Sequence, residues 1–172
     1  MKNRIFLISI ISIFIVIFVI FFKGLQNSNI YIPETKANNK IPKFSAELFY
    51  SKKLISSAEL FTSDKFYLLN IWSSWCVPCR QEHSLLMSLS ESKKVNVIGI
   101  NYKDNKNNAK FFLKKLGNPY EKIIFDRKGI HAIEWAAYGV PESFLIHNGL
   151  IIKRYIGPLS EQSIKEIELL IK

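Results

Sequence analysis

The pair Cys76 and Cys79 is the feature that most constrains this chain. The segment Trp75-Cys76-Val77-Pro78-Cys79 holds the only two cysteines of the 172-residue sequence, and it lies between a strand-like apolar run and a helical pattern. Scaffolding cysteines are usually many and dispersed, whereas a lone C-x-x-C pair at a strand-to-helix turn indicates a working dithiol. The sequence therefore predicts thiol–disulfide exchange.

The position of each cysteine on the predicted helix suggests its role. Cys76 lies at the turn, where unpaired N–H groups and the positive end of the helix dipole favour a thiolate. The thiolate is the attacking species in exchange, so Cys76 is the candidate nucleophile. Cys79 lies one turn further and is the candidate resolving thiol. Pro78 is tolerated in a first helical turn.

The sequence also leaves two metal-binding interpretations of the cysteine pair open, a zinc site and a copper(I) site. A C-x-x-C can be half of a zinc site, but zinc needs a second pair of ligands, and the three histidines (His83, His131 and His147) are scattered. A two-thiolate copper(I) site needs only the pair. We predict that the protein binds no metal and uses no cofactor other than a redox-active Cys76–Cys79 disulfide.

Glu82 is the second candidate for chemistry. Leu85, Leu86 and Leu89 define the apolar stripe of the predicted helix, and Glu82 falls inside that stripe, one turn beyond Cys79. Burial raises the pKa of a carboxyl group toward the range useful for proton transfer. We expect Glu82 to exchange a proton with Cys79. The alternative is a glutamate at the end of the stripe that reaches water.

The N-terminal segment predicts export. Residues 5–22 form an uncharged apolar run, which as a helix would span about 27 Å, close to the hydrocarbon core of a bilayer. No small-residue cleavage site follows, so an uncleaved anchor is favoured over a cleaved signal peptide. We expect an anchor at residues 1–23, a polar linker at 24–40 and one globular domain at 41–172.

The charge balance is basic, with 24 Lys and Arg against 14 Asp and Glu. The lysines are spread along the chain rather than clustered, and no nucleic-acid motif accompanies them. A solvated basic surface explains this pattern, and no nucleic-acid partner is predicted.

The domain alternates strands and helices, which predicts an α/β fold with a mixed sheet covered by helices on both faces. Strands are predicted at 66–72, 95–101, 122–125, 143–147 and 151–156, with a hairpin turn at Asn148-Gly149. Helices are predicted at 76–90, from a cap at Asp104 to Gly117, at 130–137 and from Ser160 onward. Val140-Pro141-Glu142 precedes a strand, where a proline suits a turn and a cis bond is possible.

Two segments carry a resemblance to a known family. They are Leu69-Asn70-Ile71-Trp72…Trp75-Cys76-x-x-Cys79-Arg80-x-Glu82-His83 and Tyr138-Gly139-Val140-Pro141-Glu142-Ser143-Phe144-Leu145-Ile146. Together they resemble the membrane-tethered thioredoxin-like proteins of cytochrome c maturation (the CcmG/DsbE group, which is TlpA-like). W-C-x-x-C alone marks only thioredoxin-like proteins, whereas the flanking segments are far more specific.

The resemblance implies a three-layer thioredoxin-like fold with a strand–helix insert, here within residues 101–130. Pro141 would be cis and face the dithiol, and Trp75, Val140, Pro141 and Glu142 would line the substrate groove. Glu82 and Glu142 would match the acidic residues of the group's active site.

The same resemblance implies where the domain works and on what. It would lie in the periplasm, held by a single-pass anchor in the inner membrane. It would keep the haem-binding cysteines of apocytochrome c reduced, drawing electrons from a transmembrane thiol carrier of the DsbD/CcdA type. A related anchored reductase with another client, such as a copper-site assembly protein or a penicillin-binding protein, is the alternative.

Asn70 sharpens the expected chemistry. Thioredoxin has a buried Asp six residues before its first active cysteine, and this chain has Asn70 there. An amide cannot accept the proton, so Glu82 becomes the better candidate for that role. Pro78 occupies the second position between the cysteines, where many members of the group have proline first.

Overall fold

The computed structural model describes residues 2–26, 39–51, 53–62 and 64–171. The chain divides into two compact units, Met1–Glu34 and Thr35–Lys172. The first contains α1 (Lys2–Gln26), whose segment Arg4–Gly24 has a mean hydropathy of 3.4 and is long and apolar enough to cross a membrane. The helix therefore continues slightly beyond the predicted anchor. Most of the predicted linker lies outside the described residues.

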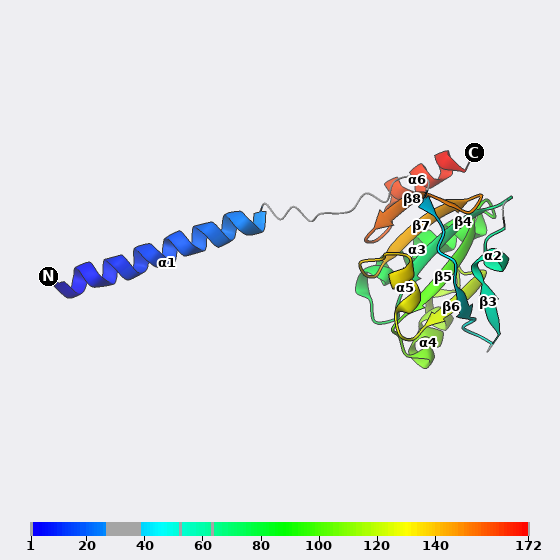
Figure 1. Cartoon of the computed structure of the whole chain (residues 1–172), viewed down its shortest axis with the longest axis horizontal. Helices are drawn as coiled ribbons and strands as arrows, with labels where there is room; N and C mark the ends of the chain where they lie inside the picture. The colour runs from blue at the N-terminus through cyan, green and yellow to red at the C-terminus, as the bar shows by residue number, and fades with distance from the viewer. Residues whose placement is uncertain (1, 27–38, 52, 63, 172) are drawn as a thin grey trace. The chain divides into compact units, whose positions relative to one another are not determined.

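A six-stranded mixed sheet forms the centre of the second unit, in the order β1-β8-β7-β4-β5-β6 (Figure 1). β4 runs parallel to β5, and β5 parallel to β6, while β7 is antiparallel to both β4 and β8. The strands are β1 (Asn39–Lys40), β4 (Phe66–Trp72), β5 (Asn96–Tyr102), β6 (Lys122–Asp126), β7 (Glu142–His147) and β8 (Leu150–Ile156). A separate two-stranded sheet pairs β2 (Ser45–Glu47) with β3 (Leu54–Ser56).

Helices cover both faces of the sheet, as predicted. One buried cluster joins the sheet to α3, α4 and α6, and a second joins its other face to α2, α5 and the small sheet. The helices are α2 (Ser57–Leu60), α3 (Val77–Glu91), α4 (Lys106–Leu116), α5 (Ile130–Glu134) and α6 (Glu161–Leu170). α4 and β6 lie within the insert that the sequence places at residues 101–130.

The alternation of β4 decides which side chains face the dithiol helix. Leu68 and Trp72 belong to the cluster under α3, whereas Leu69 and Ile71 belong to the cluster on the opposite face. Successive side chains of a strand point to opposite faces, so Asn70 shares the α3 face with Leu68 and Trp72. A polar residue therefore lies in the middle of an otherwise apolar strand, directly beneath α3.

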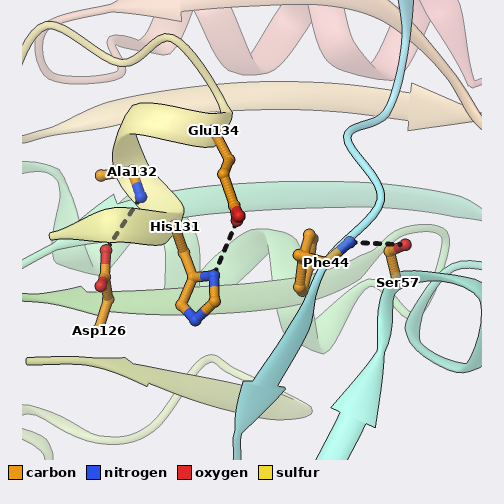
Figure 2. A network of polar contacts seen from close by, with 6 residues as sticks. All are labelled: Phe44, Ser57, Asp126, His131, Ala132 and Glu134. Atoms are coloured by element: carbon orange, nitrogen blue, oxygen red, sulfur yellow. Dashed lines mark hydrogen bonds and ion pairs between the residues drawn. The ribbon is translucent and has the colours of Figure 1, made fainter.

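Polar contacts fix the elements on the opposite face (Figure 2). Asp126, at the end of β6, accepts a hydrogen bond from the backbone N–H of Ala132 at 2.9 Å and so anchors the short helix α5. His131 Nδ1 lies 2.9 Å from Glu134 Oε2 on the same helix. These side chains serve the scaffold because they lie on the face away from α3.

Three local expectations differ from the structure. Asn105, rather than Asp104, caps α4 by accepting from the N–H groups of Asn107 and Asn108. α5 ends at Glu134 instead of continuing to residue 137. Residues 39–40, assigned to the linker, pair with β8 as β1. The hairpin turn is confirmed, since Asn148 and Gly149 have φ values of 51° and 70°, which this tight turn requires.

Gly99 in β5 leaves room for two stacked aromatic rings. Trp72 and Tyr120 stack with centroids 5.3 Å apart and an interplanar angle of 13°. A Cβ added at Gly99 would lie 2.8 Å from Trp72 Nε1 and 3.0 Å from the Tyr120 ring. Both rings are buried and packed on other core residues, so neither can move aside without disturbing the core.

We predict that Gly99→Ala lowers the free energy of unfolding by about 1–3 kcal/mol, the usual result of overpacking a core. Urea denaturation of the oxidised protein measures this change. Gly139→Ala is the matched control, because a Cβ at Gly139 meets nothing within 4 Å. Equal stability of Gly99→Ala and wild type would contradict the close packing of the Trp72 and Tyr120 rings against Gly99.

Candidate active site

Cys76 and Cys79 form a disulfide at the start of α3. Cys76 is the N-cap residue, and the backbone N–H of Cys79 points at Cys76 Sγ at 3.1 Å. In the reduced protein this donor and the helix dipole stabilise a thiolate on Cys76. Both cysteines are nearly buried, with 4% and 2% of their surface exposed, whereas the neighbouring Trp75 and Val77 are exposed. A partner would therefore approach the sulfurs past the exposed side chains of Trp75 and Val77.

The turn that leads into the dithiol is held by the segment after β5. Asp104 accepts from the backbone N–H of Ser74 at 2.6 Å and from its hydroxyl at 2.7 Å. Asn101 Nδ2 donates to the same carboxylate at 2.9 Å, and the Ser73 hydroxyl donates to the carbonyl of Tyr102. Asp104 was predicted only as a helix cap, so its support of this turn was missed.

The signal that would have revealed Asp104 was present in the strand order. β4 and β5 are parallel neighbours, and residues just past the carboxyl ends of such strands meet at one edge of the sheet. Ser74 and Asp104 both follow these ends closely. Trp75 is fixed in the same way, because its indole N–H donates to the carbonyl of Lys103 at 3.2 Å.

Glu82 lies on the buried face of α3, the helix that begins at the dithiol, and 1% of its surface is exposed. Asn70 Nδ2 donates to Glu82 Oε1 at 2.9 Å, and the backbone N–H of Leu159 donates to Oε2 at 2.7 Å. Burial raises the pKa of Glu82 to about 7, although both hydrogen bonds act in the opposite direction. The alternative in which Glu82 reaches water is therefore wrong.

Asn70 connects Glu82 to two hydroxyl groups. Its Nδ2 also donates to Ser143 Oγ at 3.0 Å, and its Oδ1 accepts from the Tyr120 hydroxyl at 2.8 Å. Burial raises the pKa of Tyr120 well above its ordinary value, so that hydroxyl keeps its proton at neutral pH. We call Tyr120, Asn70, Ser143 and Glu82 the buried polar network. The sequence pattern pointed to Asn70 and Glu82 but carried no signal for Tyr120.

The buried polar network lies close to the resolving cysteine. Glu82 follows Cys79 by three residues on α3, and side chains at this spacing are neighbours on one helix face. Glu82 and Cys79 therefore lie on the same face of α3, and proton exchange between them stays a prediction. His83, the next residue, is buried against Phe112 and lies 3.1 Å from the carbonyl of Gly117 through Nε2. Burial lowers the pKa of His83, which suits a packing role.

The Val140–Pro141 peptide bond is cis. Pro141 directly precedes β7, whose first residue Glu142 pairs with Ile71 near the end of β4. The proline is thus at the sheet edge from which the dithiol turn departs. Val140 packs against both buried clusters, including the one that contains Cys76 and Cys79.

Glu142 differs from its predicted place on the surface of a substrate groove. Its side chain is 1% exposed and forms an ion pair with Arg154, which is 6% exposed. Its other oxygen accepts from the N–H of Tyr138 at 2.9 Å, while Arg154 donates to the carbonyl of Ala136 at 2.8 Å. Because its charge is paired inside the protein, Glu142 fixes the loop before the cis proline instead of facing solvent.

Within the described residues, no group of three or more His, Cys, Asp or Glu side chains could hold a metal ion. The dithiol is the reactive centre that this arrangement offers. Exchange between it and a second disulfide requires a thiolate, a resolving thiol and a proton acceptor, and Cys76, Cys79 and Glu82 supply groups suited to these tasks.

A redox-active pair at the head of a helix on this sheet defines a thiol–disulfide oxidoreductase of the thioredoxin-like fold. The family model described as Redoxin matches residues 36–170. The chain belongs to the Redoxin family, among the DsbE-type thiol:disulfide interchange proteins.

Three relatives illustrate the likeness. The thiol:disulfide interchange protein DsbE of Escherichia coli (strain K12) is 40% identical over 132 residues, covering 74% of this chain and 71% of that protein. The thiol:disulfide interchange protein CycY of Rhizobium leguminosarum is 46% identical over 103 residues, covering 59% and 55%. The crystal structure of a DsbF homologue from Corynebacterium diphtheriae shares the fold, with a TM-score of 0.66, 24% identity and coverage of 81% and 96%.

The raised pKa of Glu82 makes folding stability depend on pH. A carboxyl group whose pKa is higher in the folded than in the unfolded state stabilises the fold fully at low pH, and this contribution is lost as pH rises through the folded value. Between pH 4 and 8, wild type should therefore lose about 3 kcal/mol relative to Glu82→Gln. Denaturant titrations of both oxidised proteins at several pH values measure this difference. A difference independent of pH would contradict the burial of an ionisable Glu82.

Proposed function

We propose that this protein is a membrane-anchored periplasmic reductase that keeps the haem-binding cysteines of apocytochrome c reduced. The observation that carries the proposal is the Cys76–Cys79 pair at the head of α3, with a backbone donor on Cys76 Sγ and a buried carboxyl group one turn beyond Cys79. Membership among the DsbE-type thiol:disulfide interchange proteins supports the exchange reaction, and the resemblance to the cytochrome c maturation group is the ground for proposing reduction and this client.

The reaction begins from the reduced protein. The Cys76 thiolate attacks one sulfur of the client disulfide, forming a mixed disulfide and releasing the other client sulfur as a thiolate. The Cys79 thiol then passes its proton to the Glu82 carboxylate and attacks Cys76 Sγ. The second client thiolate leaves, so two electrons have moved to the client and the protein holds the Cys76–Cys79 disulfide. Glu82 suits this step because a pKa of about 7 populates its carboxylate at neutral pH.

Regeneration needs two electrons from a second dithiol. We propose that a transmembrane thiol carrier of the DsbD/CcdA type supplies them through the reverse exchange. α1 would hold the domain at the membrane beside that carrier, in a single-pass topology with the domain in the periplasm. The length and hydropathy of α1 support the anchor. A dedicated reductant is needed there because exported thiols are readily oxidised.

The redox potential tests the direction of electron flow. A reductase of this kind should have a potential more reducing than about −180 mV, away from the strongly oxidising range near −120 mV. Equilibration with glutathione or dithiothreitol buffers, followed by trapping of free thiols, measures it. A potential at the oxidising end would contradict the reductase and favour an oxidant built on the same dithiol.

Trapping identifies the client. Cys79→Ser should accumulate mixed disulfides through Cys76, because the resolving thiol is gone. Cys76→Ser is the control and should trap none. A C-x-x-C apocytochrome in the trapped complexes would support the proposed client. Complexes that contain only other exported proteins would assign this reductase to another substrate.

Glu82 should control the resolving step. We expect Glu82→Gln to slow the attack of Cys79 on the mixed disulfide by about 100-fold, the usual contribution of a positioned proton acceptor. The wild-type rate should also rise as pH passes through about 7, and this rise should disappear in the variant. Rapid-mixing measurements of disulfide exchange followed by tryptophan fluorescence give both results.

Glu91→Gln is the matched control for this experiment. Glu91 lies at the opposite end of α3 and is exposed, so its loss should leave the exchange rate unchanged. An unchanged rate and pH profile in Glu82→Gln would rule out proton transfer through Glu82.

A further inference from the structure

A hollow of about 370 Å³ lies beside the dithiol, between the start of α3 and the helix α4. Trp75 and Arg80 line it on one side, immediately before Cys76 and immediately after Cys79. Asn108, Phe111 and Lys115 line it from α4. Trp75 and Arg80 flank the dithiol in the sequence, so a group bound here would lie at the start of α3, close to the residues that carry the sulfurs.

The side chains that line this hollow include two cations, Arg80 and Lys115, and no carboxylate, although Asp104 bonds to the lining residue Ser74. α4 carries four lysines and no acidic residue over Lys106–Leu116. Arg80 extends over the Phe112 ring, with its guanidinium carbon 4.9 Å from the ring centroid. In the part of the chain that the structure describes, the recorded ion pairs include neither Arg80 nor Lys115. Two cations for which the described residues show no ion pair therefore line the hollow.

Two exposed aromatic side chains stand at the same hollow. Trp75 is 57% exposed and Phe111 is 67% exposed. The bond from the Trp75 indole to the carbonyl of Lys103 limits the movement of that ring, so the surface is formed before any partner arrives. Exposed aromatic rings next to cations suit a peptide that offers both apolar and anionic side chains.

We propose that this hollow binds an acidic segment of the disulfide client. A carboxylate a few residues from the client's cysteine would pair with Arg80 and Lys115, and a neighbouring apolar side chain would pack between Trp75 and Phe111. The proposal rests on the reductase function above, and it adds a sequence preference for the client. Complementary charge raises the rate of encounter and fixes the orientation of the bound segment.

Three disulfide-bonded C-x-x-C peptides test this preference. They are identical except that the flanking positions carry Glu, Gln or Lys, and each is reduced by the full chain in zwitterionic detergent micelles. With wild type, the second-order rate constant should fall from the Glu peptide to the Gln peptide and again to the Lys peptide, by about threefold to fivefold at each step. The differences should shrink strongly in about 0.5 M salt, because screening weakens exposed ion pairs.

Variants locate the effect. Lys115→Gln and Arg80→Gln should each reduce the ratio of the Glu rate to the Gln rate. Lys115→Glu should bring this ratio close to one, because the new carboxylate offsets the charge of Arg80. The ratio of the two rates is compared because Arg80 is next to Cys79, and its replacement also alters the reactivity of the dithiol. That change affects both peptides equally and cancels in the ratio. Lys94→Gln is the matched control, since Lys94 is exposed beyond the far end of α3 and should keep the wild-type ratio.

The outcomes separate this proposal from the function on which it rests. Reduction of the Gln peptide with equal rates for all three peptides would overturn the acidic preference and leave the reductase standing. A preference that survives Lys115→Glu would also overturn it, because the discriminating charge would lie elsewhere. Equal rates combined with Lys115-dependent binding to anionic vesicles would assign the hollow to lipid headgroups and overturn the proposal. Failure to reduce any peptide would instead count against the reductase.

Discussion

The hydrogen bonds of Asn70 join four parts of the chain at a point beneath the dithiol. This side chain on β4 connects Glu82 of α3, Ser143 of β7 and Tyr120 before β6. Glu82 in turn accepts from the N–H of Leu159, which leads into α6. Leaving any of these groups buried without a partner would cost about 1–3 kcal/mol, so the network constrains how α3 sits on the sheet. The position of the cysteines follows from that constraint.

The same network is suited to a change in protonation. With Glu82 ionised, both of its oxygens accept from N–H groups. The other side-chain partners of Asn70 are hydroxyls, and a hydroxyl can donate or accept. If the Asn70 amide turned over, its Oδ1 would face Glu82 and could accept a hydrogen bond from the protonated carboxyl group. Ser143 would then donate to Asn70 instead of accepting, and Tyr120 would accept instead of donating. An aspartate at position 70 would bring a second buried acid beside the first, and like charges so close cannot both ionise readily.

Local patterns in the sequence predicted local structure well. The continuous apolar run of β4, the stripe of α3 and the Asn148-Gly149 turn each depend on neighbours a few residues away, and each is found as expected. Burial of Glu82 also followed from the stripe. Its partner Leu159 did not, because the two residues are 77 positions apart and meet only through the packing of α6. Asp104 and Glu142 were misplaced for the same reason, since their partners lie on other elements.

The distribution of charge changes how the acidic residues of this site should be understood. The resemblance to the cytochrome c maturation group placed Glu82 and Glu142 in an acidic active site. In this chain both carboxyl groups are about 1% exposed, one held by N–H donors and the other by Arg154. The cations Arg80 and Lys115 are exposed instead, and under the proposal above they are the charges that a client would meet. Because screening by solvent is weaker inside the protein, a buried acid is placed to affect groups in contact with it, such as a neighbouring thiol or a loop. An exposed cation is placed to affect an approaching partner, which is the division of roles that we propose.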